Sequence, residues 1–595
     1  MTEVDLAFPT AGDVISQTSK SRGMRRWVAS VCALTFLAYL GTLRFGFVHD
    51  DRGQIVGNPA VHSWHAVPGY FTSHVWAAVA PAFLGNDYRP LFLLWLRIND
   101  SLFGLHASGW HFTSVLAHVT ATFCVFLLAH KIIGEWPVAL CGALIFGLHP
   151  VHIEAVAWIS GVPEPLAGAL MIAAYLCWVC SREAGGRRWF SVSLVLYTLA
   201  LLTKETAIML VPIIFASLWS GFPQPVFPQP HSRAQRAWQS LRVLVPFILL
   251  TLLYLGVRTL ALKGFSHPAA KIRWLTVVLT WPSLLLFYLR LLLLPVGLSP
   301  FYGLEFVSHP TLANCALPAA AILAVAVGLW MWAARVRAVA LMIPWLVFPL
   351  LPVLNVQVFG NGNFAHNRYL YLPSVGFAIL VAMAVGRLKS GRLIFGIFPL
   401  SQALVMIALG ISGCWLVWQE SRYYTSDAAF YSYAYSSEAN PDPVIAMDYA
   451  NTLAEQGDYS RAATVYGKVI EAHPDMWNAC FNLGHMYYQR GDLNSAVQYL
   501  SRAAAGDPAQ AGAFFYLGLA KLKLQRLDDA EANLRRAVQL APAAANYHFA
   551  LGTVLRIRGK LSEALAEFSQ ELALDPRHEA AAQQIAEIRS QLAAR

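Results

Sequence analysis

Two adjacent carboxylates stand where the first long apolar run of the chain ends. Asp50 and Asp51 lie in the segment FGFVHDDRGQIVGNPAVHSW (45–64). The run before them, 27–47, is long enough to span a bilayer and follows a basic segment, so we expect a cytoplasmic N-terminus and acids on the outer side. One carboxylate can deprotonate a substrate hydroxyl while its neighbour tunes its pKa or orients the acceptor. The alternative is a solvated loop start that helps to set topology.

Three polar islands interrupt the apolar runs on the same predicted outer side. They contain His149, His152 and Glu154 (LHPVHIEAVAWISG, 148–161), Lys204 and Glu205 (TKET, 203–206), and His366 and Arg368 (NFAHNRYLYLPSVG, 363–376). Ionisable groups near membrane depth are costly, so we expect them to line a cavity. Arg368, Lys204 and Arg89 are candidates to contact a lipid phosphate, because a guanidinium pairs with two phosphate oxygens at once.

Each island also has a simpler interpretation. His149 and His152 are three residues apart and could ligate a metal with a third, unidentified ligand, which leaves a divalent metal open, although hydrogen-bonded structural histidines are commoner. Lys204 and Glu205 could form an internal ion pair, or the lysine could reach the membrane interface. Arg368 could be an interfacial anchor.

Composition places the chain among multi-span membrane proteins. Of its 595 residues, 57% are hydrophobic and only 13% are charged. Residues 1–440 carry 28 Lys and Arg against 16 Asp and Glu, whereas residues 441–595 carry 15 against 17. The basic excess therefore lies in the membrane half, where it sets orientation, and it does not indicate a nucleic-acid partner.

We expect an all-α chain with an ordered series of segments. Residues 1–26 form a cytoplasmic tail, 27–420 a transmembrane domain of about eleven spans with a first outer loop at 48–110, and 421–440 a linker. Further apolar runs lie at about 111–131, 137–149, 163–181, 189–203, 206–220, 241–261, 275–294, 314–333, 338–354, 368–386 and 393–416. Basic residues flank both ends of run 241–261, so we expect one run around 221–274 to be re-entrant or a half-span, and the span count between 206 and 294 stays open.

A 34-residue period begins near Pro441. Pro474, Pro508, Pro542 and Pro576 keep this spacing, as do the small residues Gly484, Gly518 and Gly552. Small residues at the helix crossing and Pro at the repeat end are typical of tetratricopeptide repeats. We expect a helical solenoid over 441–595, with repeats 441–474, 475–508, 509–542 and 543–576 and a capping helix. Such an array binds peptides or proteins, or serves as a spacer or self-association surface.

The ordered motifs FVHDDRGQIVGNPAVHSW, DYRPLFLLWL, LHPVHIEAVAWISG, LLTKET and NRYLYLPSVGF, followed by tandem repeats, resemble the transmembrane and tetratricopeptide-repeat O-mannosyltransferases. These belong to the C superfamily of membrane glycosyltransferases. The resemblance implies inverting transfer of a sugar, typically mannose, from a polyprenyl- or dolichyl-phosphate carrier to Ser and Thr hydroxyls of a protein that the repeats bind. A lipid- or glycan-modifying transferase and a non-catalytic membrane-anchored scaffold are the alternatives.

The resemblance also implies residue roles. Asp50 takes the role of catalytic base with Asp51 as its partner, Arg368 matches the arginine of the RYLYLPS-type motif, and the HPVHIEA motif is shared. The chain departs from relatives at Asn367, which is usually acidic, and in SGVPEP, where a basic group usually follows, so the donor sugar stays open. The Ala-, Arg- and Trp-rich composition favours a bacterial member with its repeats in the periplasm, the alternative being the endoplasmic reticulum with the repeats in the lumen.

Overall fold

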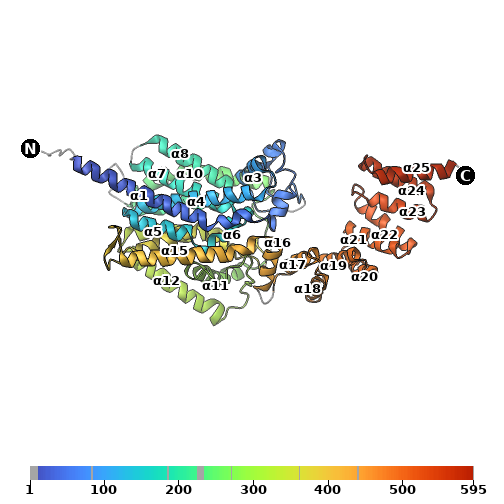
Figure 1. Ribbon diagram of the computed structural model, residues 1–595. Coiled ribbons are helices and arrows are strands. Elements are labelled where there is room, and N and C mark those ends of the chain that lie inside the picture. The colour runs from blue at the N-terminus through green and yellow to red at the C-terminus, as the bar shows by residue number, and fades with distance from the viewer. Residues whose placement is uncertain are drawn as a thin grey trace, which may run out of the picture. The chain divides into compact units, whose positions relative to one another are not determined.

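In a computed structural model the chain divides into two compact units, Met1–Glu438 and Ala439–Arg595 (Figure 1). The structure describes residues 11–81, 85–183, 186–223, 233–269, 271–360, 362–437 and 441–593. The first ten residues of the predicted cytoplasmic tail lie outside the described residues. Within the described part, both units are built of helices apart from one two-stranded hairpin, as the sequence predicts.

The first unit is a bundle of apolar helices joined by short turns. Its α-helices are α1 (Ala11–Ala38), α2 (Val67–Tyr70), α3 (Pro90–Phe103), α4 (Ala107–Ile133), α5 (Trp136–Gly147), α6 (Ile153–Ala157), α7 (Pro163–Glu183), α8 (Arg187–Thr203), α9 (Leu210–Trp219), α10 (Arg233–Ala261), α11 (Trp274–Leu293), α12 (Leu317–Ala333), α13 (Arg337–Val347), α14 (Pro373–Val385), α15 (Leu400–Ser421) and α16 (Asp427–Ser436). Its short 3-10 and π helices are η1 (Leu40–Arg44), η2 (Arg52–Val56), η3 (Trp64–Ala66), η4 (Pro150–His152), η5 (Ile159–Gly161), η6 (Glu205–Met209), η7 (Leu312–Ala316), η8 (Phe348–Leu354), η9 (Val356–Val358), η10 (Asn367–Leu370) and η11 (Arg422–Tyr424).

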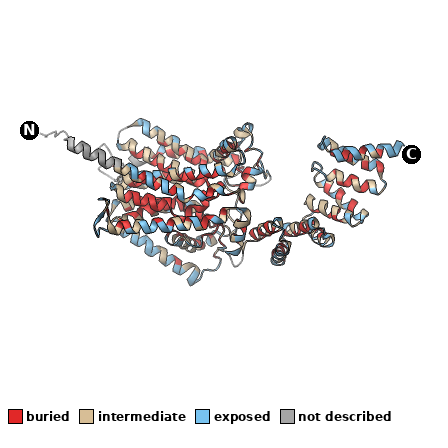
Figure 2. Cartoon of the chain, viewed as in Figure 1, coloured by how far each residue is buried: buried red, intermediate tan, exposed pale blue. Residues whose placement is uncertain are grey.

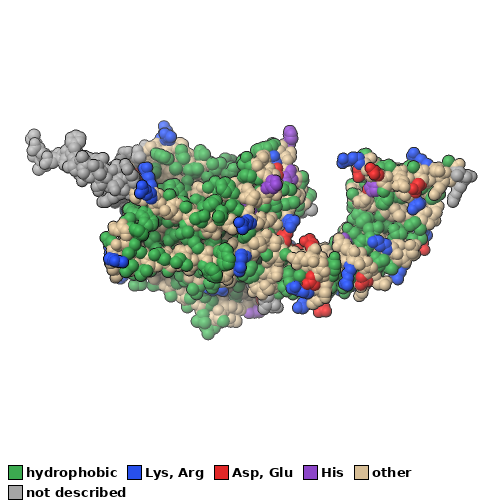
Figure 3. Space-filling view, in the orientation of Figure 1, with side chains coloured by type: hydrophobic (Ala, Val, Ile, Leu, Met, Phe, Trp, Pro, Cys, Tyr) green, Lys and Arg blue, Asp and Glu red, His purple; other side chains and the backbone are tan. Residues whose placement is uncertain are grey.

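The helices of the first unit make the chain a multi-pass membrane protein. Among the described residues, eight helices are long and apolar enough to cross a membrane, or nine if α5 and the η4–α6 segment, bent by 49°, form one broken span. Two shorter apolar helices, Glu205–Trp219 and Pro373–Val385, would bring the number to the predicted eleven. Figure 3 shows hydrophobic side chains over most of the visible flank of this unit, which is the surface that a lipid environment requires.

The core of the first unit forms where the most apolar helices pack on one another. α4 packs against α5 and α7, α7 against α8, and α14 against α5 and α13. Their facing sides bury large aromatic side chains, among them Phe146, Trp178 and Trp345. Figure 2 shows buried residues concentrated on these interior helices, whereas the outer helix α12 is largely exposed. The interior helices form a tightly packed core, and the polar loops connect the ends of these helices.

Two apolar runs differ from their predicted form. Residues 393–399, predicted as the start of a span, instead form the antiparallel hairpin β1 (Leu393–Ile394) and β2 (Phe398–Pro399), because the chain turns at Phe395 and Gly396, both with positive φ. α9 is only ten residues long. At about 1.5 Å per residue it covers roughly half of a bilayer core of about 30 Å. It lies before 221–274, where the half-span is expected, and the apolar helix in that range, Leu241–Ala261, is long enough to cross a membrane.

The second unit consists of the predicted helix pairs. They are α17 (Pro443–Glu455) with α18 (Tyr459–Ala472), α19 (Trp477–Arg490) with α20 (Leu493–Gly506), α21 (Ala511–Lys523) with α22 (Leu527–Leu540), and α23 (Tyr547–Ile557) with α24 (Leu561–Leu574), followed by α25 (Glu579–Ala593). The glycine column of the repeat lies at the crossing of each pair. A Cβ atom on Gly484 of α19 would lie 2.9 Å from the backbone nitrogen of Leu500 in α20. The solenoid predicted from the 34-residue period is therefore confirmed.

This close approach predicts opposite effects at two glycines of neighbouring helices. Gly484→Ala is expected to lower the free energy of unfolding of the repeat unit by about 1–3 kcal/mol, because overpacking forces the two helices apart. Gly467→Ala in α18 meets no atom within 4 Å, so it is expected to raise that free energy by up to about 1 kcal/mol. Pulse proteolysis of the full-length protein in urea measures both changes, and equal effects of the two substitutions would contradict this packing.

Candidate active site

The loop that carries the two acids is held by Asp51. The Asp51 side chain is fully buried, and its carboxylate accepts hydrogen bonds from the backbone nitrogens of Val48, at 3.1 Å, and Ser160, at 2.8 Å, and from the Ser160 hydroxyl. Ser160 lies in η5, between α6 and α7. Asp51 therefore attaches the loop after η1 to the loop before α7, and its oxygens are occupied by the protein itself.

Burial has a consequence for the titration of this group. Burial raises the pKa of Asp51 from its ordinary value of 3.8 to about 7, against the opposing effect of its hydrogen bonds to Ser160 and Val48. A carboxyl whose pKa is higher in the folded state binds its proton more tightly there, so its stabilising effect is complete below the unfolded value and is lost as the pH rises toward 7.

The thermal stability of the wild-type protein is expected to depend on pH in a way that the stability of the Asp51→Asn variant does not. Wild-type protein in detergent micelles should lose thermal stability more steeply than Asp51→Asn between about pH 4 and pH 7, because asparagine keeps an acceptor oxygen without an ionisable group. The difference between the two unfolding midpoints, measured across this range, isolates Asp51 from other titrating groups. Parallel midpoint curves for the two proteins would contradict the assignment.

Asp50 differs from its neighbour because it faces open space. Its side chain keeps 31% exposure, and it lines two adjoining cavities of about 540 Å³ and 460 Å³. Trp76, Trp158, Phe359 and Arg368 also line both cavities. The carboxylate of Asp50 thus stands at the junction of two spaces, each large enough for part of a substrate.

The larger space, which we call the cationic cavity, combines positive charge with apolar walls. Arg89, Lys204, Arg258 and Arg368 line it, and so do the carboxylates of Asp50, Asp87, Glu164 and Glu205, so that its cations stand among an equal number of acids. Its apolar lining comes from helix ends and loops around α10 and η8 and includes Leu255, Phe265, Leu351, Val353 and Val358. The arrangement suits a ligand that has an anionic group and a hydrocarbon part.

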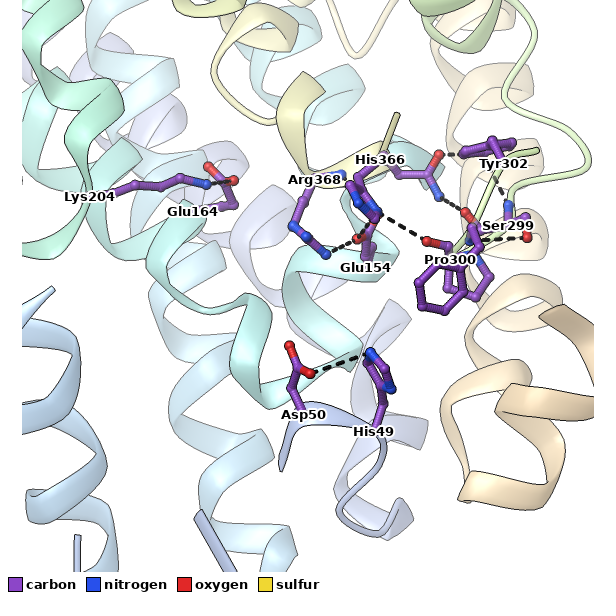
Figure 4. A network of polar contacts seen from close by, with 12 residues as sticks. His49, Asp50, Glu154, Glu164, Lys204, Ser299, Pro300, Tyr302, His366 and Arg368 are labelled. Carbon is purple, nitrogen blue, oxygen red and sulfur yellow. Dashed lines mark hydrogen bonds and ion pairs between the residues drawn. The ribbon is translucent and has the colours of Figure 1, made fainter. Parts of the chain in front are cut away.

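Arg368 is placed by a carboxylate beneath it. Glu154 of α6 is fully buried, forms an ion pair with the Arg368 guanidinium and accepts a hydrogen bond of 3.1 Å from the Arg368 backbone nitrogen (Figure 4). The guanidinium also lies 5.0 Å from the ring of Trp158 and 5.3 Å from that of Tyr369. A guanidinium has five N–H donors, so its remaining donors are available to a ligand in either cavity.

The other two predicted cations have carboxylate partners as well. Lys204 pairs with Glu164 of α7, and the adjacent Glu205 does not hold it (Figure 4). Glu205 instead pairs with Arg89 at 3.1 Å, and Asp87 pairs with the same guanidinium at 2.7 Å. Of the alternatives for Lys204 and Glu205, the described contacts therefore favour ion pairs with partners elsewhere in the chain over a pair between the two neighbours.

Sequence analysis did not select Arg258, which differs from these three cations. It donates to the carbonyl oxygens of Phe265, at 2.6 Å, and Asn86, at 2.9 Å. Its Nε atom has no hydrogen-bond partner, and within the described ranges it takes part in no ion pair. The signal was present in the sequence, because Arg258 lies inside the apolar run 241–261, where a charge is costly.

The smaller space, which we call the aromatic cavity, has a different lining. Besides the residues that it shares with the cationic cavity, it is lined by His49, Phe301, His366 and Phe430. Burial and the neighbouring charge of Arg368 lower the pKa of His366 well below its ordinary value, so its ring is neutral. Neutral aromatic rings can pack against an uncharged ligand segment whichever side chains that segment carries.

The histidines of the HPVHIEA motif lie apart from both spaces. His149 Nε2 contacts the carbonyl oxygen of Leu292 at 3.0 Å, and His152 Nε2 contacts the Ser374 hydroxyl at 2.8 Å. Neither histidine is among the lining residues of the two cavities. Within the part of the chain that the structure describes, there is no group of three or more His, Cys, Asp or Glu side chains that could hold a metal ion. Both histidines have hydrogen-bond partners typical of structural residues.

Asn367, the departure from the expected acidic residue, also has a packing role. Its side chain accepts from the Tyr302 hydroxyl and donates to the carbonyl oxygen of Ser299 at 3.0 Å. It therefore joins the loop before α12 to η10, beside Arg368. Of the predicted site residues, the structure brings Asp50, Arg89, Lys204, Glu205 and Arg368 to the lining of one cavity, with Glu154 directly behind it.

Comparison with known proteins shows which families the chain resembles. The family described as Dolichyl-phosphate-mannose-protein mannosyltransferase matches residues 87–250, and the Tetratricopeptide repeat family matches 448–511 and 516–579. Protein O-mannosyl-transferase TMTC1 of Mus musculus is 27% identical over 569 residues, which cover 77% of this chain. The chain is similar to protein O-mannosyl-transferases over most of its length. Protein O-mannosyl-transferase Tmtc2 of Drosophila melanogaster is 32% identical over 47% of this chain.

The relationship to the O-mannosyl-transferases covers only part of those proteins. The chain spans 59% of the length of the mouse protein and 31% of the fly protein. Among solved structures, the "Crystal structure of YrrB: a TPR protein with an unusual peptide-binding site" is 25% identical and covers 26% of this chain and 79% of that chain, with a TM-score of 0.25. The transferase family match at 87–250 includes Arg89, Glu154 and Lys204, whereas Asp50 and Arg368 lie outside it.

Proposed function

We propose that this protein is a membrane glycosyltransferase that moves a sugar from a lipid-phosphate carrier to Ser or Thr hydroxyls of proteins. The observation that carries this proposal is the position of Asp50. A single partly exposed carboxylate stands between a cavity with cations and apolar walls and a cavity walled by aromatic rings. Two substrates placed in these two spaces would meet at this carboxylate.

Asp50 acts on the acceptor. An acceptor hydroxyl in the aromatic cavity gives its proton to the Asp50 carboxylate as its oxygen attacks the anomeric carbon of the donor sugar. The carboxylates of Asp51, Glu154 and Glu164 are engaged by Ser160, Arg368 and Lys204, respectively, so they are poorly placed to compete as bases. With one carboxylate acting as base, the attack is a single displacement that inverts the anomeric centre.

The cationic cavity acts on the donor. As the new bond forms, the bond between the anomeric carbon and the phosphate oxygen breaks, and its electron pair leaves with the lipid phosphate. Arg258 and Arg368 stabilise this leaving group, because charge that develops on phosphate is best met by fixed cations in a site with little water. Arg89 and Lys204, each already paired with carboxylates, contribute mainly to the shape and potential of the cavity.

The relatives support the identity of the donor and the acceptor. Their printed names describe transfer of mannose to protein hydroxyls, and one matching family is named for a dolichyl-phosphate-mannose donor. We therefore assign a polyprenyl- or dolichyl-phosphate mannose as donor. The repeat unit, as a tetratricopeptide solenoid, is suited to bind the acceptor protein.

The proposed orientation follows from the basic residues near the N-terminus. A positive segment in α1, at 20–26 and before its apolar part, keeps the N-terminus in the cytoplasm and puts Asp50 on the outer side. We assign the protein to a bacterial inner membrane with its repeats in the periplasm, the alternative being the endoplasmic reticulum with its repeats in the lumen. In either compartment, periplasm or lumen, the acceptors are exported proteins.

Mass spectrometry of glycopeptides from cells with and without the protein tests this function. The proposal predicts Ser- or Thr-linked hexose on exported proteins that disappears when the gene is deleted and returns with the wild-type gene. If the hexose is lost from lipids or glycans and protein glycopeptides stay unchanged, the acceptor assignment is wrong. Rescue by the repeat unit alone would indicate a scaffold.

A further inference from the structure

We infer that His49, together with Asp427 and Tyr431 of α16, positions the catalytic carboxylate of Asp50. This inference rests on the function proposed above and goes beyond it, because it assigns a role to a helix after the last span. α16 lies in the segment 421–440 that we expected to be a linker, yet Phe430 and Ala434 of this helix are fully buried in the first unit.

One carboxylate of α16 holds the chain on both sides of Asp50. Asp427 Oδ1 accepts a hydrogen bond of 2.8 Å from the backbone nitrogen of His49, and Asp427 Oδ2 accepts one of 2.8 Å from Arg52 Nε. Residues 49 and 52 bracket the catalytic acid. Asp427 therefore restrains the short segment that carries Asp50 at two points, and Asp51 restrains it at a third.

The backbone at His49 needs this restraint. His49 has φ of 51°, a left-handed conformation that is uncommon for a residue with a Cβ atom. A loop free of α16 would relax from this conformation, and the direction of the next side chain, that of Asp50, would change with it. The strain is located beside the proposed base, where such strain often has a functional reason.

The imidazole of His49 links Asp50 to α16. Its Nδ1 lies 2.9 Å from the Tyr431 hydroxyl, and its Nε2 lies 3.4 Å from Asp50 Oδ1 (Figure 4 shows the second contact). When the tyrosine donates its proton to Nδ1, the ring proton lies on Nε2 and faces the carboxylate. The ring of His49 then lies against one carboxylate oxygen of Asp50, which leaves the other for the acceptor hydroxyl.

Aromatic packing prevents the imidazole from turning away. The ring stacks on Phe430 of α16, with centroids 5.2 Å apart and planes at 20°. Phe301 meets it edge-on at 5.5 Å, and Trp158 lies 5.6 Å away on another side. These rings also line the aromatic cavity, so an acceptor that fills this cavity would contact the same rings that hold His49.

Three substitutions separate this positioning role from a general effect on folding. Tyr431→Phe removes one hydroxyl and keeps the ring. His49→Asn removes the imidazole with a residue that tolerates positive φ. Asp427→Ala removes both loop contacts. Each is expected to lower kcat by about 10- to 100-fold with the donor KM within about twofold of wild type, because a base displaced by about 1 Å loses this much rate. Loss of folding alone would instead reduce the amount of active protein.

The control comes from the same helix. Tyr433 of α16 donates its hydroxyl to the carbonyl oxygen of Leu298 at 2.9 Å and lines neither cavity. Tyr433→Phe therefore removes a comparable hydrogen bond without touching His49, and its kcat should equal that of wild type. Asp427→Asn, which keeps an acceptor oxygen, should recover part of the rate that Asp427→Ala loses.

The test is a kinetic assay of full-length protein in detergent micelles, with polyprenyl-phosphate mannose as donor and a Ser-containing peptide recovered from the glycopeptide experiment as acceptor. If the wild-type protein transfers mannose and both His49→Asn and Tyr431→Phe keep the wild-type kcat, the positioning role is overturned and the proposed function stands. Absence of transfer by the wild-type protein would overturn the proposed function, and this inference with it.

Discussion

Asp50→Asn is expected to reduce sugar transfer by about 10²- to 10⁴-fold, the range that a positioned general base contributes. Asparagine has nearly the same shape but cannot accept a proton from the acceptor hydroxyl. Because the Asp50 side chain keeps 31% exposure and its one ion-pair contact is with His49 at 3.4 Å, the substitution should leave the protein folded. The measurement is the initial rate of peptide glycosylation at saturating donor.

Asp87→Asn is the matched control for this prediction. Asp87 also lines the cationic cavity, but it lies away from the aromatic cavity and pairs with Arg89, which keeps Glu205 as a second partner. Its loss removes the same charge from the same space, so the rate should change only a few-fold. Equal losses in the two variants would mean that Asp50 contributes only to the potential of the cavity.

Arg258→Gln is expected to raise the donor KM by about 10- to 100-fold. A hydrogen bond to a charged group contributes about 1.5–3 kcal/mol, and about 1.4 kcal/mol corresponds to a tenfold change in affinity. The substitution leaves no buried carboxylate unpaired, because Arg258 forms its described hydrogen bonds with the carbonyl oxygens of Phe265 and Asn86. Arg368→Ala would be harder to interpret, since it would strand the buried Glu154.

Arg290→Gln provides the comparison for Arg258. Arg290 lies in the last turn of α11, donates to the carbonyl oxygen of Val296 at 3.4 Å and lines neither cavity. It resembles Arg258 in being a helix-end arginine bonded to a loop carbonyl, but it lacks access to the donor. Its donor KM should stay at the wild-type value, and a similar rise in both variants would argue against a phosphate contact by Arg258.

The sequence predicted the repeat unit closely because its signal is local and periodic. Each column of the 34-residue repeat reports one contact between the two helices of a pair, as at Gly484 and Leu500. Four copies of the same pattern reinforce one another, so the spacing alone predicts a solenoid of helix pairs. In the membrane unit, apolar length identified the helices, but it could not detect the hairpin at 393–399, because its residues are as apolar as a span.

The sequence predicted several of the residues that line the cationic cavity, but it predicted few of their ion-pair partners. Charged residues near membrane depth identified Asp50, Arg89, Lys204 and Arg368, which the structure brings to one cavity. Their partners come from distant elements, so neighbours in sequence were misleading. Lys204 pairs with Glu164, 40 residues away, and not with the adjacent Glu205.

The contacts of α16 were beyond sequence reasoning for the same reason. Asp427 and Tyr431 lie 378 and 382 residues from His49, and nothing in their local pattern indicates a partner in the first outer loop. Hydrogen bonds between segments this far apart depend on the packing of the whole bundle. A polar stretch between a span and a repeat array is ordinarily a linker, which is why the sequence favoured that interpretation.

The central claim is that Asp50 catalyses transfer of a lipid-linked sugar to a protein hydroxyl. The most direct measurement incubates purified wild-type and Asp50→Asn protein with polyprenyl-phosphate mannose and an acceptor peptide and follows the peptide by mass spectrometry. The account predicts that wild-type protein adds one hexose to Ser or Thr and that Asp50→Asn, folded to the same extent, adds almost none. Transfer at the wild-type rate by Asp50→Asn would contradict it.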